Sequence, residues 1–396
     1  DERGAVASGF KMKNDFAIVA IILAAGLSER MGRFKPLLPL GPQRVVERVV
    51  KLFQGAGLED ILVVVGQRAN EVEEAVAPLN VHCVENPDFL DGMFSSVQAG
   101  IRVLPPRCRA FFVHPVDIPL VRTQTVKRLI SAFNDASAAV VYPSFDGKRG
   151  HPPLIQSSLA TRILKWDGTG GLQGFLQGCD AGSFELAVAD EAVMMDLDTP
   201  EDYRRMLSRV RHEGLPSTEE CRVLMDRFQS LPAATAAHCR AVAFVARQLA
   251  ETLHAAGVDI DVELTSVAAL LHDIARMEKD HAAAGARLLE FHGFTRLAPI
   301  VGSHMDLDVN AEAPIDEAQV IYLADKLVSG DRRVNLAQRF ARKMEKYGQD
   351  RQAALAIDCK RKNAQRIQEK IERITGLPIN ALTGIAGVHD GETQCT

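Results

Sequence analysis

Residues 16–35 read FAIVAIILAAGLSERMGRFK, and this stretch decides the fold of the first half of the chain. Its apolar part, residues 16–25, is about half of the ~20 residues that a bilayer span needs, so we expect a buried strand. The turn that follows is built from small residues and ends in the cations Arg30 and Lys35. Small residues let backbone N–H groups close on phosphate oxygens, and the two cations can neutralise charge at an attacked phosphorus. The predicted nucleotide-binding residues of this loop are Leu23, Ala24, Ala25 and Gly26.

Two familiar phosphate-binding patterns are missing from this loop. It has no GxxxxGK[ST], which excludes a Walker loop, and no GxGxxG, which excludes a dinucleotide fingerprint. The whole chain carries 46 Lys and Arg against 51 Asp and Glu, a net charge of -5. No global basic field therefore points to nucleic acid or to an anionic membrane as a partner. Any phosphate chemistry must come from local sites.

The composition is that of a globular protein. With 396 residues, of which 47% are hydrophobic and 24% charged, the chain is long enough for two or three domains. Its seven cysteines are dispersed and form no CxxC pair, which favours a reducing compartment over a disulfide framework. We therefore expect a cytoplasmic protein that binds neither membrane nor nucleic acid.

The pattern of the chain changes near residue 210. Before it, short β-branched runs such as DILVVVG and AFFVHPVD alternate with amphipathic segments, which predicts a Rossmann-like, mostly parallel α/β sheet with helices on both faces. After the break at residues 214–217 we expect helices and no strand. The predicted segments are a disordered or vector-derived tail with Met12 as the native start (1–15), an α/β domain (16–210), a linker (211–218), an all-α domain with C-terminal helices (219–380) and a tail (381–396).

At the phosphate-binding loop the chain resembles the nucleotidyltransferases that complete the molybdenum cofactor. Their opening motif, LAAGxSxRMGxxKxLLPLxG, is matched almost throughout by residues 23–41. Further motifs of this MobA-like NTP transferase family recur in order, at residues 91–100, 114–120, 150–152, 168–171 and 196–202. The resemblance implies Mg²⁺-dependent transfer of a nucleotide to molybdopterin, with a molybdoenzyme apoprotein as a further partner.

Two aspartates suit the metal of such an enzyme. Asp117 follows the apolar strand at residues 110–113, and Asp198 precedes a helix start, so both should lie at the sheet edge where open α/β folds place ligands. Two carboxylates can hold Mg²⁺ and leave positions free for triphosphate oxygens. With Arg30 and Lys35 they complete the predicted catalytic set. An ordinary helix N-cap is the alternative for Asp198.

The resemblance also implies which base is bound. The LAAG form is similar to the cytidylyltransferases, whereas guanylyltransferases more often read LAGG, so Ala25 points to CTP. Gly92 and Ser96 would lie against the base or the ribose, near the start of a helix from Ser95. Helix capping is the alternative for the two serines. His151 would line the acceptor side, and a structural turn histidine before two prolines is the alternative.

Histidine and aspartate recur together in the second half of the chain. The pair His272-Asp273 ends an apolar run at residues 267–271. Adjacent helix residues point about 100° apart, so the pair can supply a terminal imidazole and a bridging carboxylate only if the helix ends at the metal site. A bridging carboxylate implies two ions about 3.5–4 Å apart that clamp a phosphoester. Imidazole and carboxylate suit Fe, Mn, Zn, Co or Ni better than Ca²⁺.

The order of these residues resembles the HD phosphohydrolase superfamily over about residues 220–345. The resemblance implies one metal held by His238, His272, Asp273 and Asp325, and a second, bridged by Asp273, held by His281 and His304. The motifs LHDxxK and ADK are similar to those of bacterial dinucleoside tetraphosphate hydrolases, which implies a nucleotide or polyphosphate ligand. Arg276 stands at the usual lysine position. The lack of GYP after the third histidine argues against a cyclic-dinucleotide phosphodiesterase.

A basic run follows these residues. Residues 331–373 contain 13 Lys or Arg against 6 Asp or Glu. We expect a solvated helix face, and the alternative is a surface that guides polyphosphates to the second site.

The leading hypothesis is a bifunctional enzyme, an Mg²⁺-dependent CTP:molybdopterin cytidylyltransferase fused to a metal-dependent HD phosphohydrolase. Two alternatives stay open. One is nucleotidyl transfer to a sugar phosphate on the same fold. The other is a cofactor-delivery protein whose HD half senses a nucleotide without hydrolysing it.

Overall fold

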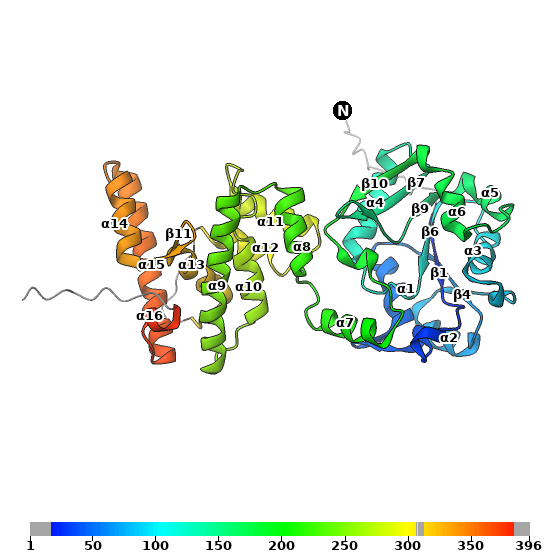
Figure 1. The fold of residues 1–396 in the computed structure, drawn as a ribbon, viewed down its shortest axis with the longest axis horizontal. Coiled ribbons are helices and arrows are strands. Elements are labelled where there is room, and N and C mark those ends of the chain that lie inside the picture. The colour runs from blue at the N-terminus through cyan, green and yellow to red at the C-terminus, as the bar shows by residue number, and fades with distance from the viewer. Residues whose placement is uncertain (1–16, 306, 308–312, 384–396) are drawn as a thin grey trace, which may run out of the picture. The chain divides into compact units, whose positions relative to one another are not determined.

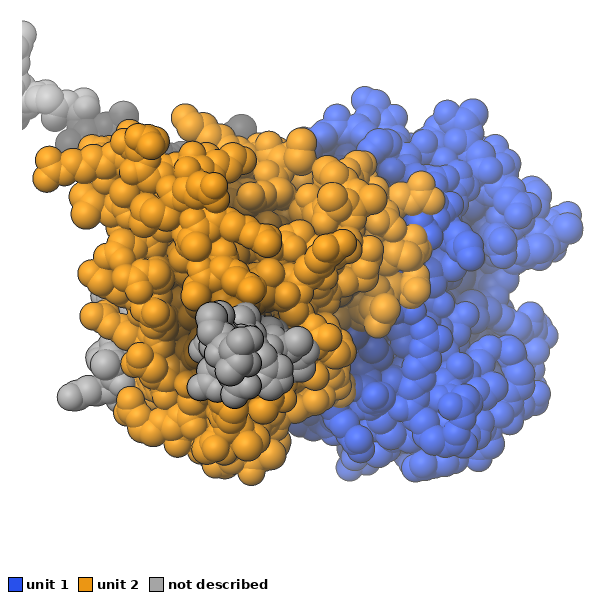
Figure 2. All heavy atoms as spheres, turned by 60° about the vertical axis from the view of Figure 1, so that its left-hand side comes forward, with its two compact units in different colours: residues 1–211 blue, residues 212–396 orange. Residues whose placement is uncertain are grey.

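The computed structural model describes residues 17–305, 307 and 313–383 (Figure 1). The chain divides between Arg211 and His212 into two compact units, coloured blue and orange in Figure 2. The expected N-terminal tail at residues 1–15 lies outside the described residues, as does most of the C-terminal one. The expected tail at 381–396 starts inside α16 (Ile379–Thr383), because Leu382 is buried and belongs to the fold.

The first unit is built on one mixed sheet in the strand order β10-β7-β9-β6-β1-β4-β5, with β8 paired to β7. The strands are β1 (Ala17–Leu23), β4 (Asp60–Val65), β5 (His82–Glu85), β6 (Cys108–Pro115), β7 (Val140–Phe145), β8 (Lys148–Arg149), β9 (Leu154–Gln156) and β10 (Ser183–Ala187). β1 lies between β4 and β6 and is parallel to both, as expected for strands that are apolar along their whole length. The antiparallel strand β9, between β6 and β7, was not predicted.

Helices cover both faces of the sheet, as predicted. They are α1 (Val45–Gly55), α2 (Ala69–Val76), α3 (Met93–Arg102), α4 (Thr123–Asp135), α5 (Ala160–Leu164), α6 (Gly171–Gln177) and α7 (Pro200–Arg211), and a small hairpin joins β2 (Pro39–Leu40) to β3 (Gln43–Arg44). On one face, α3, α5 and α6 share a buried core with β1. On the other, Phe53 of α1 packs on Phe112 of β6 with ring centroids 5.4 Å apart. Gly100 lets α3 approach the sheet, because an added Cβ would lie 2.5 Å from Ile21 Cγ2.

The second unit is helical, except for a short hairpin of β11 (Val328–Ser329) and β12 (Arg332–Arg333) that the sequence did not predict. Its helices are α8 (Thr218–Val223), α9 (Ala233–Ala255), α10 (Val262–Leu271), α11 (His281–Phe291), α12 (Ala298–Ser303), α13 (Glu317–Lys326), α14 (Leu336–Tyr347), α15 (Arg351–Thr375) and α16. Because α7 ends at Arg211 and α8 begins at Thr218, the connection between them is shorter than the predicted linker. Among the described residues, no helix has both the length and the apolar character needed to cross a bilayer.

Candidate functional sites

The phosphate-binding loop leaves the carboxyl end of β1 and closes on itself. Ala24 N donates to Val64 O at 2.9 Å, which fixes the start of the loop to β4. Ser28 adopts a left-handed conformation with a φ of 59°, and its Oγ accepts a hydrogen bond from Lys35 N at 3.0 Å. This bond draws the two ends of residues 28–35 together, so the lysine is held by backbone contacts and not by its side chain alone.

A cavity of about 340 Å³ lies in front of the loop. The predicted nucleotide-binding residues that line it are Leu23, Ala25, Gly26, Gly92 and Ser96. Ala24 is fully buried and does not line the cavity. Leu90 and Met93, which are 71% and 59% exposed, also line the cavity and were not predicted. Exposed apolar side chains beside a phosphate-binding loop offer contact area to a planar base. The sequence feature that could have identified them is their position on either side of the Asp91-Gly92 turn.

The predicted catalytic side chains meet at the edge of the sheet. Lys35 Nζ lies 2.7 Å from Asp198 Oδ1 and 3.3 Å from Asp117 Oδ2. Arg30 Nη1 lies 2.7 Å from the other carboxylate oxygen of Asp198. The backbone joins the two aspartate loops as well, because Leu197 N donates to Asp117 O at 2.8 Å. The four side chains line the same cavity, so two anions and two cations converge where a triphosphate would bind.

The capping alternative for Asp198 does not match the geometry. Its carboxylate is engaged by Lys35 and Arg30, whereas Asp202 accepts hydrogen bonds from Thr199 N at 2.8 Å and Asp198 N at 3.3 Å. Thr199 Oγ1 in turn accepts from Asp202 N at 3.2 Å, so Thr199 and Asp202 cap the start of α7 reciprocally.

Asp117 and Asp198 fit a hard divalent cation. Their side chains are 21% and 27% exposed and offer carboxylate oxygens, which Mg²⁺ prefers. Burial raises the pKa of the nearby Asp196, and the negative charges of Asp117 and Asp198 raise it further. The strand ends thus carry an excess of negative charge that an added cation would relieve.

Ser96 is held by a residue that the sequence did not single out. The buried Asn86 donates from Nδ2 to Ser96 Oγ at 3.0 Å and to Ser95 Oγ at 2.9 Å.

Helix α3 starts at Met93, two residues before the predicted start, because Gly92, with a φ of 95°, ends the preceding turn in a non-helical conformation. No side chain caps the helix, so the capping alternative for the two serines fails.

A second cavity of about 610 Å³ shares Leu23, Met93 and Pro115 with the first. Arg149 lies over the ring of Tyr142, 4.7 Å from its centroid, and both line this cavity. His151, the predicted acceptor-side residue, lines it as well. Burial lowers the pKa of His151, so its imidazole is neutral at pH 7. A larger, less polar space therefore adjoins the phosphate cavity.

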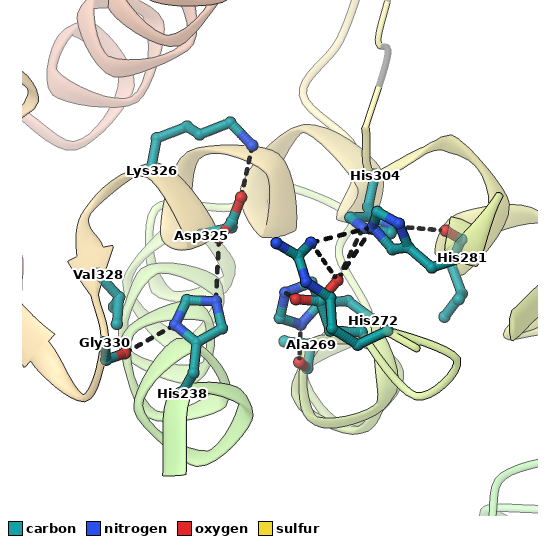
Figure 3. A network of polar contacts seen from close by, with 12 residues as sticks. His238, Ala269, His272, His281, His304, Asp325, Lys326, Val328 and Gly330 are labelled. Atoms are coloured by element: carbon teal, nitrogen blue, oxygen red, sulfur yellow. Dashed lines mark hydrogen bonds and ion pairs between the residues drawn. The ribbon is translucent and has the colours of Figure 1, made fainter. Parts of the chain in front are cut away.

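In the second unit, the predicted ligands form two groups (Figure 3). One contains His238, His272 and Asp325, and the other Asp273, His281 and His304. Asp273 faces both, since its Oδ1 lies 3.2 Å from His281 Nε2 and 3.4 Å from His304 Nε2, while Oδ2 lies 3.7 Å from His272 Nε2. Helix α10 ends at Leu271, immediately before His272, so the helix end adjoins the site as the prediction required.

The backbone orients the imidazoles. Nδ1 of His238, His272 and His304 lies 2.7–2.8 Å from the carbonyl oxygens of Gly330, Ala269 and Val301 respectively. A carbonyl accepts only from a protonated nitrogen, so each Nδ1 donates. Nε2 of His272 and of His304 then keeps its lone pair, as in metal-binding histidines, whereas Nε2 of His238 is hydrogen-bonded to Asp325 Oδ1 at 3.2 Å. Nε2 of His272 and of His304 is buried and has no hydrogen-bond partner among the described residues. These unsatisfied atoms and the mixed imidazole and carboxylate set fit transition-metal ions.

The charge states of His272, His281 and Asp325 suit metal binding, whereas burial of His238 is outweighed by its hydrogen bond to Asp325, which raises the pKa of His238. Burial lowers the pKa of His272 to about 4 and also lowers that of His281, so both are neutral at pH 7. Burial opposes ionisation of Asp325, but Lys326 and His238 outweigh it and hold its pKa well below the usual value. Arg276 Nη1 lies 3.5 Å from Asp273 Oδ1, so the residue at the usual lysine position still places a cation at the site.

Comparison with known proteins matches each unit separately. Residues 20–186 match the MobA-like NTP transferase domain, and residues 235–330 match the HD domain. The molybdenum cofactor cytidylyltransferase of Escherichia coli K12 is 32% identical over 190 residues, which cover 47% of this chain and 94% of that protein. The nicotine blue oxidoreductase of Paenarthrobacter nicotinovorans is 28% identical over 197 residues, 48% of this chain and 96% of that protein. A solved nucleotidyl transferase from Methanothermobacter thermautotroptrophicus is 25% identical with a TM-score of 0.44, and covers 50% of this chain and 98% of its own.

Fold and matches together define a nucleotidyltransferase joined to a helical HD domain. The chain belongs to the MobA-like NTP transferase family. The predicted family, the α/β-then-helical fold class and the assignment as an enzyme are thereby confirmed.

Proposed function

We propose that the first unit is a CTP:molybdopterin cytidylyltransferase, which joins CMP to molybdopterin and releases pyrophosphate. The observation that carries the proposal is the placement of Lys35 between Asp117 and Asp198, beneath the LAAG loop. The similarity to the cytidylyltransferase of Escherichia coli K12 and the alanine at position 25 support CTP as the nucleotide.

In this proposal the chain supplies positioning and charge neutralisation. An oxygen of the acceptor attacks the α-phosphorus, and pyrophosphate leaves as that bond forms. Lys35 and Arg30 would neutralise the charge that develops on the phosphate oxygens. Asp117 and Asp198 would hold Mg²⁺, which when bound polarises the phosphoryl oxygens. The second cavity would hold the pterin, because it adjoins the first at Leu23.

The base preference tests the cytidylyl assignment. With molybdopterin as acceptor, we expect CTP to support at least a tenfold higher kcat/KM than GTP, a difference of about 1.4 kcal/mol. Pyrophosphate release measured with each NTP checks this. Equal use of the two nucleotides would remove the cytidylyl assignment, and turnover with a sugar phosphate in place of the pterin would favour that alternative acceptor.

Arg149 tests the acceptor cavity. Its guanidinium is held by Asp180 at 2.6 Å and Glu185 at 2.7 Å, over Tyr142, at the cavity wall. We expect Arg149→Met to raise the KM for molybdopterin at least fivefold while the KM for CTP changes less than twofold. Arg162→Met, an exposed arginine of α5 outside both cavities, is the matched control. A rise in the KM for CTP alone would move the acceptor elsewhere.

We propose that the second unit is a metal-dependent phosphohydrolase for a nucleotide or polyphosphate, and that the two compact units are the two functional domains. The buried, unsatisfied Nε2 atoms of His272 and His304 support metal binding. Fe, Mn, Zn, Co and Ni all suit the ligands, and elemental analysis of the purified protein distinguishes them. The dispersed cysteines support a cytoplasmic location, and a molybdoenzyme apoprotein is the proposed recipient of the product.

A further inference from the structure

One side of the cavity at the second site, called here the cationic wall, is formed by Arg339, Lys343 and Lys360. These residues follow the segment 235–330 that matches the HD domain. Helices α14 and α15 pack together beside α13 (Figure 1). A cavity of about 350 Å³ is lined both by the metal-binding groups and by Arg339, Lys343 and Lys360 of these two helices. Most cations of the basic run are exposed, as expected for a solvated face, but packing of α14 on α15 and of α15 on α13 turns Arg339, Lys343 and Lys360 toward the site.

Several cations meet on this side of the cavity, and Asp325 pairs with Arg339 and Lys326. Arg339 and Lys343 are four residues apart on one face of α14, a spacing at which like charges destabilise a helix. Burial lowers the pKa of Lys343 to about 8, and the charges of Arg339 and Lys326 add to the decrease. Lys326 is itself buried and pairs with Asp325 at 2.5 Å. The repulsion among these groups would be relieved by a bound anion.

Arg339 is oriented toward the metal-binding groups. Its Nη1 donates to Val328 O, and its Nη2 lies 3.6 Å from Asp325 Oδ1. Its Nε is buried and has no hydrogen-bond partner within the described part of the chain. Arg339 lines the cavity with its guanidinium beside Asp325, so a phosphate bound there would lie next to this cation.

We propose that Arg339, Lys343 and Lys360 bind the phosphate chain of a linear polyphosphate, so that the second site takes a polyphosphate ester and not a phosphomonoester. This rests on the proposed phosphohydrolase function, in which the metal-binding groups hold the phosphate that is attacked. The wall then holds the phosphates that follow along the chain. A monoester would leave the wall unfilled, and each further phosphate adds negative charge that the wall attracts.

Titration of the full chain with inorganic tripolyphosphate in a calorimeter tests this wall. We expect the wild type to bind tripolyphosphate at least thirtyfold more tightly than orthophosphate. The double substitution Lys343→Met with Lys360→Met should weaken tripolyphosphate binding at least tenfold, with metal content unchanged. Lys346→Met with Lys362→Met removes the same charge from exposed positions of the same helices and should change the Kd less than twofold. The conservative double substitution Lys343→Arg with Lys360→Arg should retain wild-type binding.

The outcomes separate this wall from the hydrolase itself. Two results would overturn the polyphosphate-binding proposal, whatever the site hydrolyses. One is an equal Kd for the wild type and the Lys343→Met, Lys360→Met protein, and the other is no binding of tripolyphosphate by the wild type. Loss of binding in the double variant supports the wall. The wild type can bind tripolyphosphate in this way and yet release no phosphate from tripolyphosphate or p-nitrophenyl phosphate with any of the five metals. In that case the hydrolase proposal fails and the polyphosphate-binding proposal is retained.

Discussion

The substitution Asp273→Ala is expected to strip the second unit of its transition metal and to abolish its phosphohydrolase activity. Asp273 is the only anion that we assign to both ligand groups, with oxygens 3.2 and 3.4 Å from His281 and His304 and 3.7 Å from His272. Without it, the second group keeps two imidazoles and no carboxylate. Elemental analysis should show metal below a tenth of the wild-type content. Asp259→Ala, an exposed aspartate outside the site, should retain the full content.

Cytidylyl transfer by the Asp273→Ala protein should continue at the wild-type rate. The proposed transferase residues lie at or before Asp198, within the first compact unit. The competing expectation is allosteric control, in which metal occupancy biases two states of the transferase. Turnover of CTP in the variant decides between them. A change above fivefold, with the fold intact by circular dichroism, would overturn independence and favour the nucleotide-sensing alternative.

The substitution Asp117→Asn is expected to reduce nucleotidyl transfer by about a thousandfold or more, because it replaces an anionic metal ligand with a neutral amide of the same shape. Folding should persist, since the bond from Leu197 N is accepted by the backbone oxygen of Asp117 and not by its side chain. Pyrophosphate release at limiting Mg²⁺ measures the effect. The side chain of Lys35 keeps Asp198 as a partner at 2.7 Å, so its position is retained.

Asp135→Asn provides the control for this substitution, because Asp135 ends α4 outside the cavity. It should leave transfer within twofold of the wild type. Near-normal activity of Asp117→Asn at limiting Mg²⁺ would show that the metal lies elsewhere. Loss of activity together with loss of the folded spectrum would point to a structural role for the carboxylate instead.

Local sequence determined the elements of the sheet and the identity of the candidate groups. Apolar runs that end in turn residues, such as the one at Ala17–Leu23, are strands wherever they pair, because their burial requires it. The order of the motifs also identifies Asp117, Asp198 and the histidines as candidate site residues. The pairing of β9 could not be predicted in this way, since three residues, Leu154–Gln156, carry no periodicity and their partners lie far along the chain.

The tertiary structure alone decided which polar groups share a site. Asn86 reaches Ser96 only because the chain after β5 runs past the start of α3. The basic run after residue 330 has helical periodicity on its own, but periodicity does not specify the neighbour that a helix face meets. Packing of α14 on α15 and of α15 on α13 places Arg339, Lys343 and Lys360 at the cavity of the candidate metal site and leaves Lys346 exposed. Residue types and spacing therefore determined the chemistry of each half, whereas long-range packing decided how much charge surrounds it.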